Sequence, residues 1–171
     1  MKEGGIGGAN TRTGLEFEKR SSLADVFSKS KKYTVSGRDV LYKNKKVAEI
    51  FVKNELYSKL LKPKKVNVKK LISKRLMPDS ALLVKKTLYI IEMKFQKVAG
   101  SVDEKLQTCD FKNKQYKKLL SPLGIKVKYV YLLNDWFAKK EYKDTLKYVK
   151  SVSCYYFFNK LPFKFLNLPK H

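Results

Sequence analysis

The sequence predicts an α/β protein that folds as a single domain covering residues 1–171. Short runs rich in β-branched and aromatic residues recur along the chain, and such runs are typical of strands. Segments with the apolar spacing of an amphipathic helix separate the later runs. With 171 residues, 43% of them hydrophobic, the chain can bury one core and no more. Strands and helices therefore both contribute to the predicted fold.

The N-terminal part of the chain combines a glycine-rich arm with a helix. Residues 1–10 include a glycine-rich stretch from Gly4 to Gly8, which predicts a flexible arm. The arm is not a P-loop, because it lacks the Gly-Lys-Ser/Thr ending and a preceding strand. Thr11 or Thr13 is the candidate N-cap of a helix, and Glu16, three residues after Thr13, would complete a capping box. Glu18, three residues after Leu15, is expected to point inward with it, and the alternative is an exposed Glu18 paired with a neighbouring cation.

Three short strands and one helix are predicted between this helix and the middle of the chain. The strands comprise residues 33–35, 40–42 and 47–52. Asn44-Lys45 forms the turn between the last two strands. Asn54 is a candidate N-cap for a helix that Pro63 stops. The lysine-rich segment 62–75 is expected either to pack beside a nucleic acid or to form a solvated face.

A β-hairpin is predicted within the stretch MPDSALLVKKTLYIIEMKFQ at residues 77–96. Residues 81–84 form its first strand and residues 88–95 its second, with a tight turn at Lys85-Lys86. The apolar composition of both strands indicates a buried position in a sheet.

Polar side chains gather at the end of this hairpin that lies away from the turn. Side chains on a strand alternate between its faces, so Glu92, Lys94 and Gln96 share one face. Asp79, at the start of the hairpin, can come close to Glu92. Two carboxylates and one ammonium would then surround one point, and unpaired charge in so apolar a strand is costly. A Mg²⁺ ion would explain the set, because hard cations bind carboxylate oxygens and complete their shell with water and phosphate.

Helical and strand patterns alternate after the hairpin. Ser101 and Glu104 form a capping box at the start of a helix, which Pro122 and Gly124 end. The buried face of this helix is expected to carry Leu106, Cys109, Asn113, Tyr116 and Leu120. A strand, a short helix and a final strand are predicted at residues 125–133, 134–150 and 153–158. The aromatic tail at residues 162–168 is expected to fold onto the body or onto a partner.

The net charge of +24 is the strongest signal in the composition, with 39 Lys and Arg against 15 Asp and Glu. Such an excess attracts polyanions and favours a nucleic-acid partner, and the alternative is a solvated, lysine-rich surface. The single histidine is His171, the last residue. Zinc chemistry of the His-Glu-x-x-His kind is therefore excluded.

The sequence also predicts the compartment. No apolar run approaches the roughly 20 residues that a membrane helix needs, so no membrane partner is expected. The first residues contain no apolar segment that could serve as a secretory signal, which predicts a cytoplasmic protein. Cys109 and Cys154 fit no zinc pattern and are expected to be reduced thiols there, with one disulfide as the alternative.

The polar residues of the hairpin resemble a nuclease signature. Pro78-Asp79, followed after twelve residues by Glu92-Met93-Lys94, resembles the PD-(D/E)XK signature of the restriction-endonuclease-like superfamily. The resemblance implies a restriction-endonuclease-like core: a mixed β-sheet with the catalytic hairpin at its centre, flanked by helices. It implies that Asp79 and Glu92 bind one or two Mg²⁺ ions, for which Mn²⁺ can substitute. Lys94 would orient or activate the attacking water, and Gln96 would position water or phosphate.

Two further segments resemble type II restriction endonucleases. GGANTRTGLEFE at residues 7–18 resembles their opening, where a helix glutamate helps to complete the metal site, which makes Glu18 a third metal ligand. Gln96 and the Gly-Ser-x-Asp-Glu-Lys-Leu segment at residues 100–106 resemble the part that follows their motif. The similarity points especially to small catalytic subunits of heterodimeric type IIS enzymes. DNA contacts are expected from polar residues in and after these segments, namely Arg12, Lys97, Ser101, Lys105, Lys112, Lys114 and Lys117.

These observations favour one function over two alternatives. The leading hypothesis is a Mg²⁺-dependent endonuclease that cleaves double-stranded DNA, with a larger recognition subunit or a second copy of the chain as partner. The alternatives are a structure-specific nuclease such as a junction resolvase and a non-catalytic basic DNA-binding module. The set of Asp79, Glu92 and Lys94 favours a nuclease, because a binding module has no use for carboxylates that face phosphate.

Overall fold

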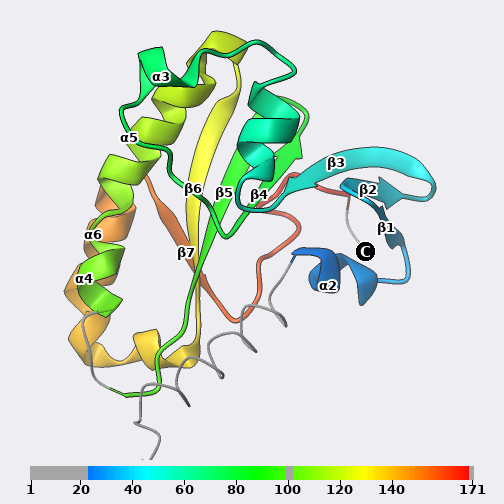
Figure 1. Ribbon diagram of the computed structural model, residues 1–171. Coiled ribbons are helices and arrows are strands. Elements are labelled where there is room, and N and C mark those ends of the chain that lie inside the picture. The colour runs from blue at the N-terminus through cyan, green and yellow to red at the C-terminus, as the bar shows by residue number, and fades with distance from the viewer. Residues whose placement is uncertain (1–22, 99–101, 170–171) are drawn as a thin grey trace, which may run out of the picture.

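A seven-stranded mixed β-sheet forms the centre of the structure, a computed structural model that describes residues 23–98 and 102–169 (Figure 1). The strands lie across the sheet in chain order. They are β1 (Tyr33–Ser36), β2 (Asp39–Tyr42), β3 (Lys45–Phe51), β4 (Ser80–Val84), β5 (Thr87–Lys94), β6 (Lys126–Leu133) and β7 (Tyr155–Phe158). The α/β class predicted from the sequence is confirmed.

The β4–β5 hairpin lies in the middle of this sheet. Strands β1 to β5 pair antiparallel with their neighbours, whereas β6 is parallel to β5 and β7 is parallel to β6. Ser80 lies opposite Ile91, and the strands turn at Lys85-Lys86, where Lys85 has a φ of 52°. The predicted hairpin and its turn are therefore confirmed.

Helices connect the parallel strands, because a parallel pair needs a long crossover. The described helices and helical turns are α2 (Leu23–Ser28), η1 (Leu56–Leu61), α3 (Val68–Leu71), α4 (Val102–Leu106), α5 (Cys109–Leu120), η2 (Ser121–Leu123), η3 (Asp135–Ala138), η4 (Lys140–Tyr142) and α6 (Lys143–Ser151). The α4–α5 pair lies between β5 and β6, and α6 lies between β6 and β7. None of the described helices is long and apolar enough to span a membrane.

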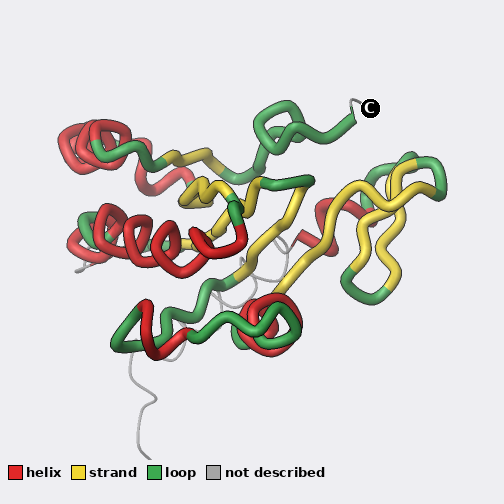
Figure 2. Tube along the Cα trace, turned by 90° about the horizontal axis from the view of Figure 1, so that it is seen from above, coloured by secondary structure: helices red, strands yellow, loops and turns green. Residues whose placement is uncertain are grey.

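The two faces of the sheet are covered differently. Buried side chains of η1, α5 and α6 pack on the face that carries Ile90, whereas α2 and the C-terminal segment cover the face that carries Ile91. Figure 2 shows the longer helices on one side of the strands. Phe163 of the C-terminal segment stacks on Phe27 of α2, with ring centroids 5.3 Å apart. The aromatic tail therefore folds onto the body of the protein.

Three helical segments differ in detail from the sequence prediction. The helix after Asn54 is a π-helix, in which the Lys62 N–H donates to the Tyr57 carbonyl, five residues back, at 2.9 Å. The helix that follows residue 101 is interrupted between α4 and α5. At this break the Thr108 hydroxyl donates to the Lys105 carbonyl at 2.8 Å and competes with the helix for that acceptor. The segment predicted as one helix after β6 passes through η3 and η4 before α6 begins.

Candidate functional site

The predicted site residues lie where β4 begins and β5 ends. Asp79 directly precedes β4, and the pairing of Ser80 with Ile91 brings it opposite the last part of β5. The backbone N–H of Met93 donates to Asp79 Oδ2 at 2.7 Å. This charge-assisted hydrogen bond holds the carboxylate in one orientation.

Lys94 bridges two carboxylates at this point. Its Nζ lies 3.2 Å from Glu92 Oε2 and 3.6 Å from Asp79 Oδ2, and it donates to the Met93 carbonyl at 3.1 Å. Glu92 is only 4% exposed, and a buried carboxylate beside a second one needs a nearby cation. The structure thus brings together Asp79, Glu92 and Lys94, as the hairpin pattern predicts.

A second lysine reaches the same carboxylate from a helix. Lys112 of α5 places its Nζ 3.5 Å from Glu92 Oε2. The sequence assigned Lys112 to DNA contact alone and missed this ion pair. The helical spacing of the sequence could have predicted this contact, because Lys112 lies three residues after Cys109 and four before Tyr116. That spacing places Lys112 at the border of the buried helix face.

The floor of the site is buried and polar. Burial raises the pKa of Tyr116 and Tyr129 far above the ordinary value, and the negative charge of Glu92 raises both further. Both phenols therefore stay protonated and neutral. Asn113 Oδ1 and Tyr116 Oη are buried without a hydrogen-bond partner among the described residues. Buried polar atoms normally bind a protein group or water, so this floor has hydrogen-bonding capacity to spare.

The chain just after β5 is held by Asn134, which sequence reasoning missed. Asn134 Oδ1 accepts from the Gln96 N–H at 3.1 Å, and its Nδ2 donates to the Gln96 carbonyl at 2.8 Å. A signal was present, because Asn134 is the first polar residue after the buried strand β6 and parallel neighbours end at the same edge. Strand β5 ends at Lys94, so pairing does not carry the alternation to the Gln96 side chain, whose role stays a prediction.

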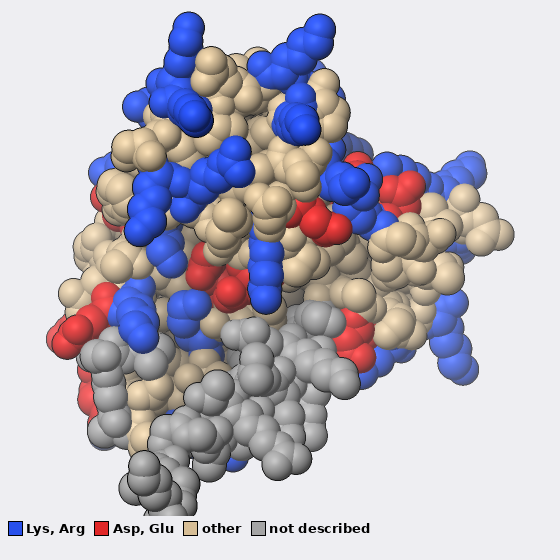
Figure 3. Space-filling model, viewed as in Figure 1, with Lys and Arg blue, Asp and Glu red and all other residues tan. Residues whose placement is uncertain are grey.

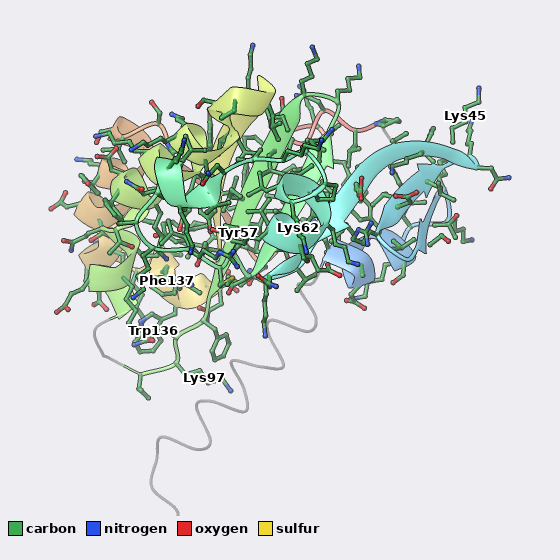
Figure 4. The ribbon with its side chains drawn as sticks, turned by 45° about the horizontal axis from the view of Figure 1, so that its top comes forward. Lys45, Tyr57, Lys62, Lys97, Trp136 and Phe137 are labelled. Atoms are coloured by element: carbon green, nitrogen blue, oxygen red, sulfur yellow. The ribbon has the colours of Figure 1, made fainter. Side chains whose placement is uncertain are left out.

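The other predicted site residues are distributed more widely. Glu18, Arg12 and Ser101 lie outside the described residues. Lys97 is exposed, with its Nζ 5.7 Å from the centre of the Phe95 ring (Figure 4). On the helices that precede β6, Lys105 and Lys117 are exposed, and Lys114 pairs with Asp110 at 2.7 Å. Their contact with DNA stays a prediction.

The site offers oxygen ligands to a metal ion. The described part of the chain contains no group of three or more His, Cys, Asp or Glu side chains that could hold one. Asp79 Oδ1 and Glu92 Oε1, however, have no hydrogen-bond or ion-pair partner among the described residues. Two carboxylates fit Mg²⁺, which takes few protein ligands and keeps several waters.

Comparison with known proteins adds no assignment: no family model, curated protein or solved structure matches this chain. Its function is therefore inferred from the geometry of the site and from the sequence.

Proposed function

We propose that the protein is a Mg²⁺-dependent endonuclease that hydrolyses phosphodiester bonds in double-stranded DNA, either a type II restriction endonuclease or the catalytic subunit of one. The observation that carries this proposal is the position of Lys94 between Asp79 and Glu92. Phosphodiester hydrolysis needs an oriented water and positive charge where negative charge develops. This set of side chains can supply both.

The position of the set in the sheet supports the proposal. The antiparallel β4–β5 hairpin is central, and β5 pairs in parallel with β6 after a helical crossover. This arrangement is compatible with the restriction-endonuclease-like core that the motif implies.

Asp79 and Glu92 would hold one or two Mg²⁺ ions, for which Mn²⁺ can substitute. When bound, the ion stabilises negative charge on the reacting phosphate and lowers the pKa of its water. The free oxygens, Asp79 Oδ1 and Glu92 Oε1, would be the ligand atoms. Glu18 would be the third ligand.

Lys94 would orient the attacking water and neutralise charge on the phosphate oxygens. Its ammonium is already held by two carboxylates and the Met93 carbonyl, so little reorganisation is needed as the reaction proceeds. Lys112 of α5 lies 3.5 Å from the same Glu92 oxygen and adds a second positive charge.

The surface supports a polyanionic substrate. Figure 3 shows lysine and arginine side chains spread over much of one face of the molecule, with few acidic side chains between them. Together with the net charge of +24, this favours association with DNA that weakens as salt is added.

One active site hydrolyses one phosphodiester bond, so a double-strand break needs a second site. That site would come from a larger recognition subunit or from a second copy of the chain. The resemblance to type IIS small subunits favours the different subunit, and light scattering of the purified chain combined with plasmid digestion separates the two arrangements. A monomer that nicks one strand supports the partner arrangement, whereas a stable dimer with clean double-strand cuts supports the homodimer.

The proposed activity is tested by incubating supercoiled plasmid and a four-way DNA junction with the chain, with Mg²⁺ or with EDTA. We expect Mg²⁺-dependent nicking of the plasmid that Glu92→Gln abolishes and Lys45→Ala preserves. Cutting of the junction alone would identify a resolvase instead. DNA binding without any cutting, also in the presence of a partner subunit, would identify a binding module.

A further inference from the structure

A positively charged pocket of about 560 Å³ lies on the helix-covered side of the sheet. Four cations line it, namely Lys62, Lys65, Lys69 and Arg75, and no acidic side chain does. Tyr57 forms one wall, and Figure 4 shows Tyr57 and Lys62 next to each other on this side of the molecule. A concave surface lined by charge of one sign concentrates ions of the opposite sign.

The cations of this pocket have no carboxylate partner among the described residues. Glu55 is the only acidic residue between positions 53 and 75, and its carboxylate accepts the Val52 N–H at 2.9 Å. Lys46 and Lys114, on other surfaces, do pair with acids. Like charges that share a pocket repel one another, and a bound anion relieves that repulsion.

Arg75 is held in place by an aromatic ring. Its guanidinium carbon lies 5.1 Å from the centre of the Tyr57 ring. Tyr57 is itself fixed, because its hydroxyl donates to the Leu76 carbonyl at 2.8 Å and accepts from the Leu76 N–H at 3.0 Å. A guanidinium that rests on a ring loses less freedom when it binds a phosphate and keeps its N–H groups for two hydrogen bonds.

Tyr57 also connects the pocket to the candidate active site. The Leu76 backbone that it holds precedes Asp79 by three residues. Burial raises the pKa of Tyr116, and electrostatic interactions with Glu92, Tyr57 and Asp79 raise it further. The Tyr57 hydroxyl and both carboxylates therefore lie near one buried phenol, and Tyr57 also lines the pocket.

We propose that this pocket binds a backbone phosphate of the DNA strand that enters the site formed by Asp79, Glu92 and Lys94. The inference rests on the proposed function, because that function makes DNA the substrate. Lys62, Lys65 and Lys69 supply charge, and Arg75 supplies the directed hydrogen bonds. The pocket thereby positions the strand so that the neighbouring phosphate lies at the carboxylates.

The test measures binding rather than cleavage. Affinity of the full chain for a fluorescent DNA duplex is determined by anisotropy in EDTA over a series of salt concentrations. The pocket variant is Lys62→Ala with Lys69→Ala. The control variant is Lys45→Ala with Lys86→Ala, which removes the same charge at two exposed turns, and Figure 4 shows Lys45 at the far tip of the β2–β3 hairpin.

Each lost phosphate contact lowers the slope of log affinity against log salt by about 0.9 for duplex DNA. We expect the slope of the pocket variant to fall by about 0.9, the value for one phosphate, and its affinity at low salt to drop at least about tenfold, while the control keeps the wild-type slope. Circular dichroism and thermal melting verify that both variants are folded. Equal slopes for the pocket variant and the control would overturn the proposal.

Competition with inorganic phosphate and with a deoxynucleotide monophosphate separates the two sources of a phosphate group. Displacement of the duplex by either small anion at micromolar concentration, lost in the pocket variant, would assign the pocket to a free anion and overturn the proposal. Displacement only at concentrations that act through ionic strength supports it. Because binding is measured in EDTA, it is independent of the plasmid assay in Mg²⁺. A chain that binds as expected in EDTA but does not cut DNA in Mg²⁺, also in the presence of a partner subunit, would refute the nuclease and leave the pocket assigned.

Discussion

Two clusters in this molecule have the same composition, two carboxylates and two cations, in different surroundings. At the edge of the sheet, Arg38 lies 3.2 Å from Glu49, and Lys46 lies 2.6 Å from Asp39 and 3.3 Å from Glu49. These side chains are 21–50% exposed. Water screens exposed charges, so such a network contributes little to stability.

The second cluster lies at the centre of the sheet and consists of Asp79, Glu92, Lys94 and Lys112, whose side chains are 6–28% exposed. Partial burial strengthens the attraction between these charges and makes each one costly to leave unpaired. The comparison teaches that burial, not composition, separates a screened surface ion-pair network from a group of charges that depend strongly on one another.

The largest effect is expected from neutralising the central carboxylates. Asp79→Asn, Glu92→Gln and Lys94→Ala should each lower the cleavage rate at least about a hundredfold, because the ion and the ammonium supply several kcal/mol at the transition state. DNA binding in EDTA should persist. Initial rates of plasmid nicking measure the effect. Glu49→Gln in the edge cluster is the matched control, and a central variant that cleaves like the wild type would remove the distinction between the clusters.

Mg²⁺ should distinguish the clusters by stabilising the protein at only one of them. An ion that binds only the folded chain adds about 2.7 kcal/mol to the free energy of unfolding when its free concentration is about 100 times its Kd. We expect the melting temperature to rise with Mg²⁺ concentration for the wild type and for Glu49→Gln, but not for Glu92→Gln. An equal rise in all three proteins would show that Mg²⁺ binds elsewhere.

Removing the helix lysine should have an intermediate effect. Lys112→Ala leaves the buried Glu92 with Lys94 alone, so we expect a loss of about 1–2 kcal/mol in unfolding free energy and about tenfold slower cleavage. Lys114→Ala, on the same helix, breaks a pair with Asp110 in which the lysine is 71% exposed, and should change neither quantity measurably. Denaturant unfolding and nicking assays of the two variants compare these positions directly. Equal losses of unfolding free energy and cleavage rate in both variants would mean that the charge of the helix, rather than the contact with Glu92, determines these quantities.

The smallest effect is expected at the edge of the sheet. Glu49→Gln removes the carboxylate shared by Arg38 and Lys46, yet exposed pairs contribute at most about 1 kcal/mol. That small contribution should decrease further in high salt. Denaturant unfolding at low and high salt checks this. A loss that exceeded the one caused by Lys112→Ala would reverse the ranking of the two clusters.

Much of the central cluster is predictable from local patterns. In a hairpin closed by Lys85-Lys86, counting outward from the turn pairs the start of β4 with the end of β5, so Asp79 must lie near Glu92. The helix face from Leu106 to Leu120 is likewise visible in the apolar spacing, and its predicted members are buried. The break at Thr108 is not predictable from periodicity, because a single hydroxyl that competes for the Lys105 carbonyl leaves the apolar pattern intact.

By itself the sequence determined the α/β class, the hairpin and the convergence of Asp79, Glu92 and Lys94, because each depends on residues close together in the chain. Only the tertiary structure decided that Lys112 joins Glu92 and that Asn134 holds Gln96, 38 positions away. Such contacts depend on how the helical crossovers pack beside β5. That packing is set by the whole buried core rather than by local periodicity, so no short stretch of sequence encodes it.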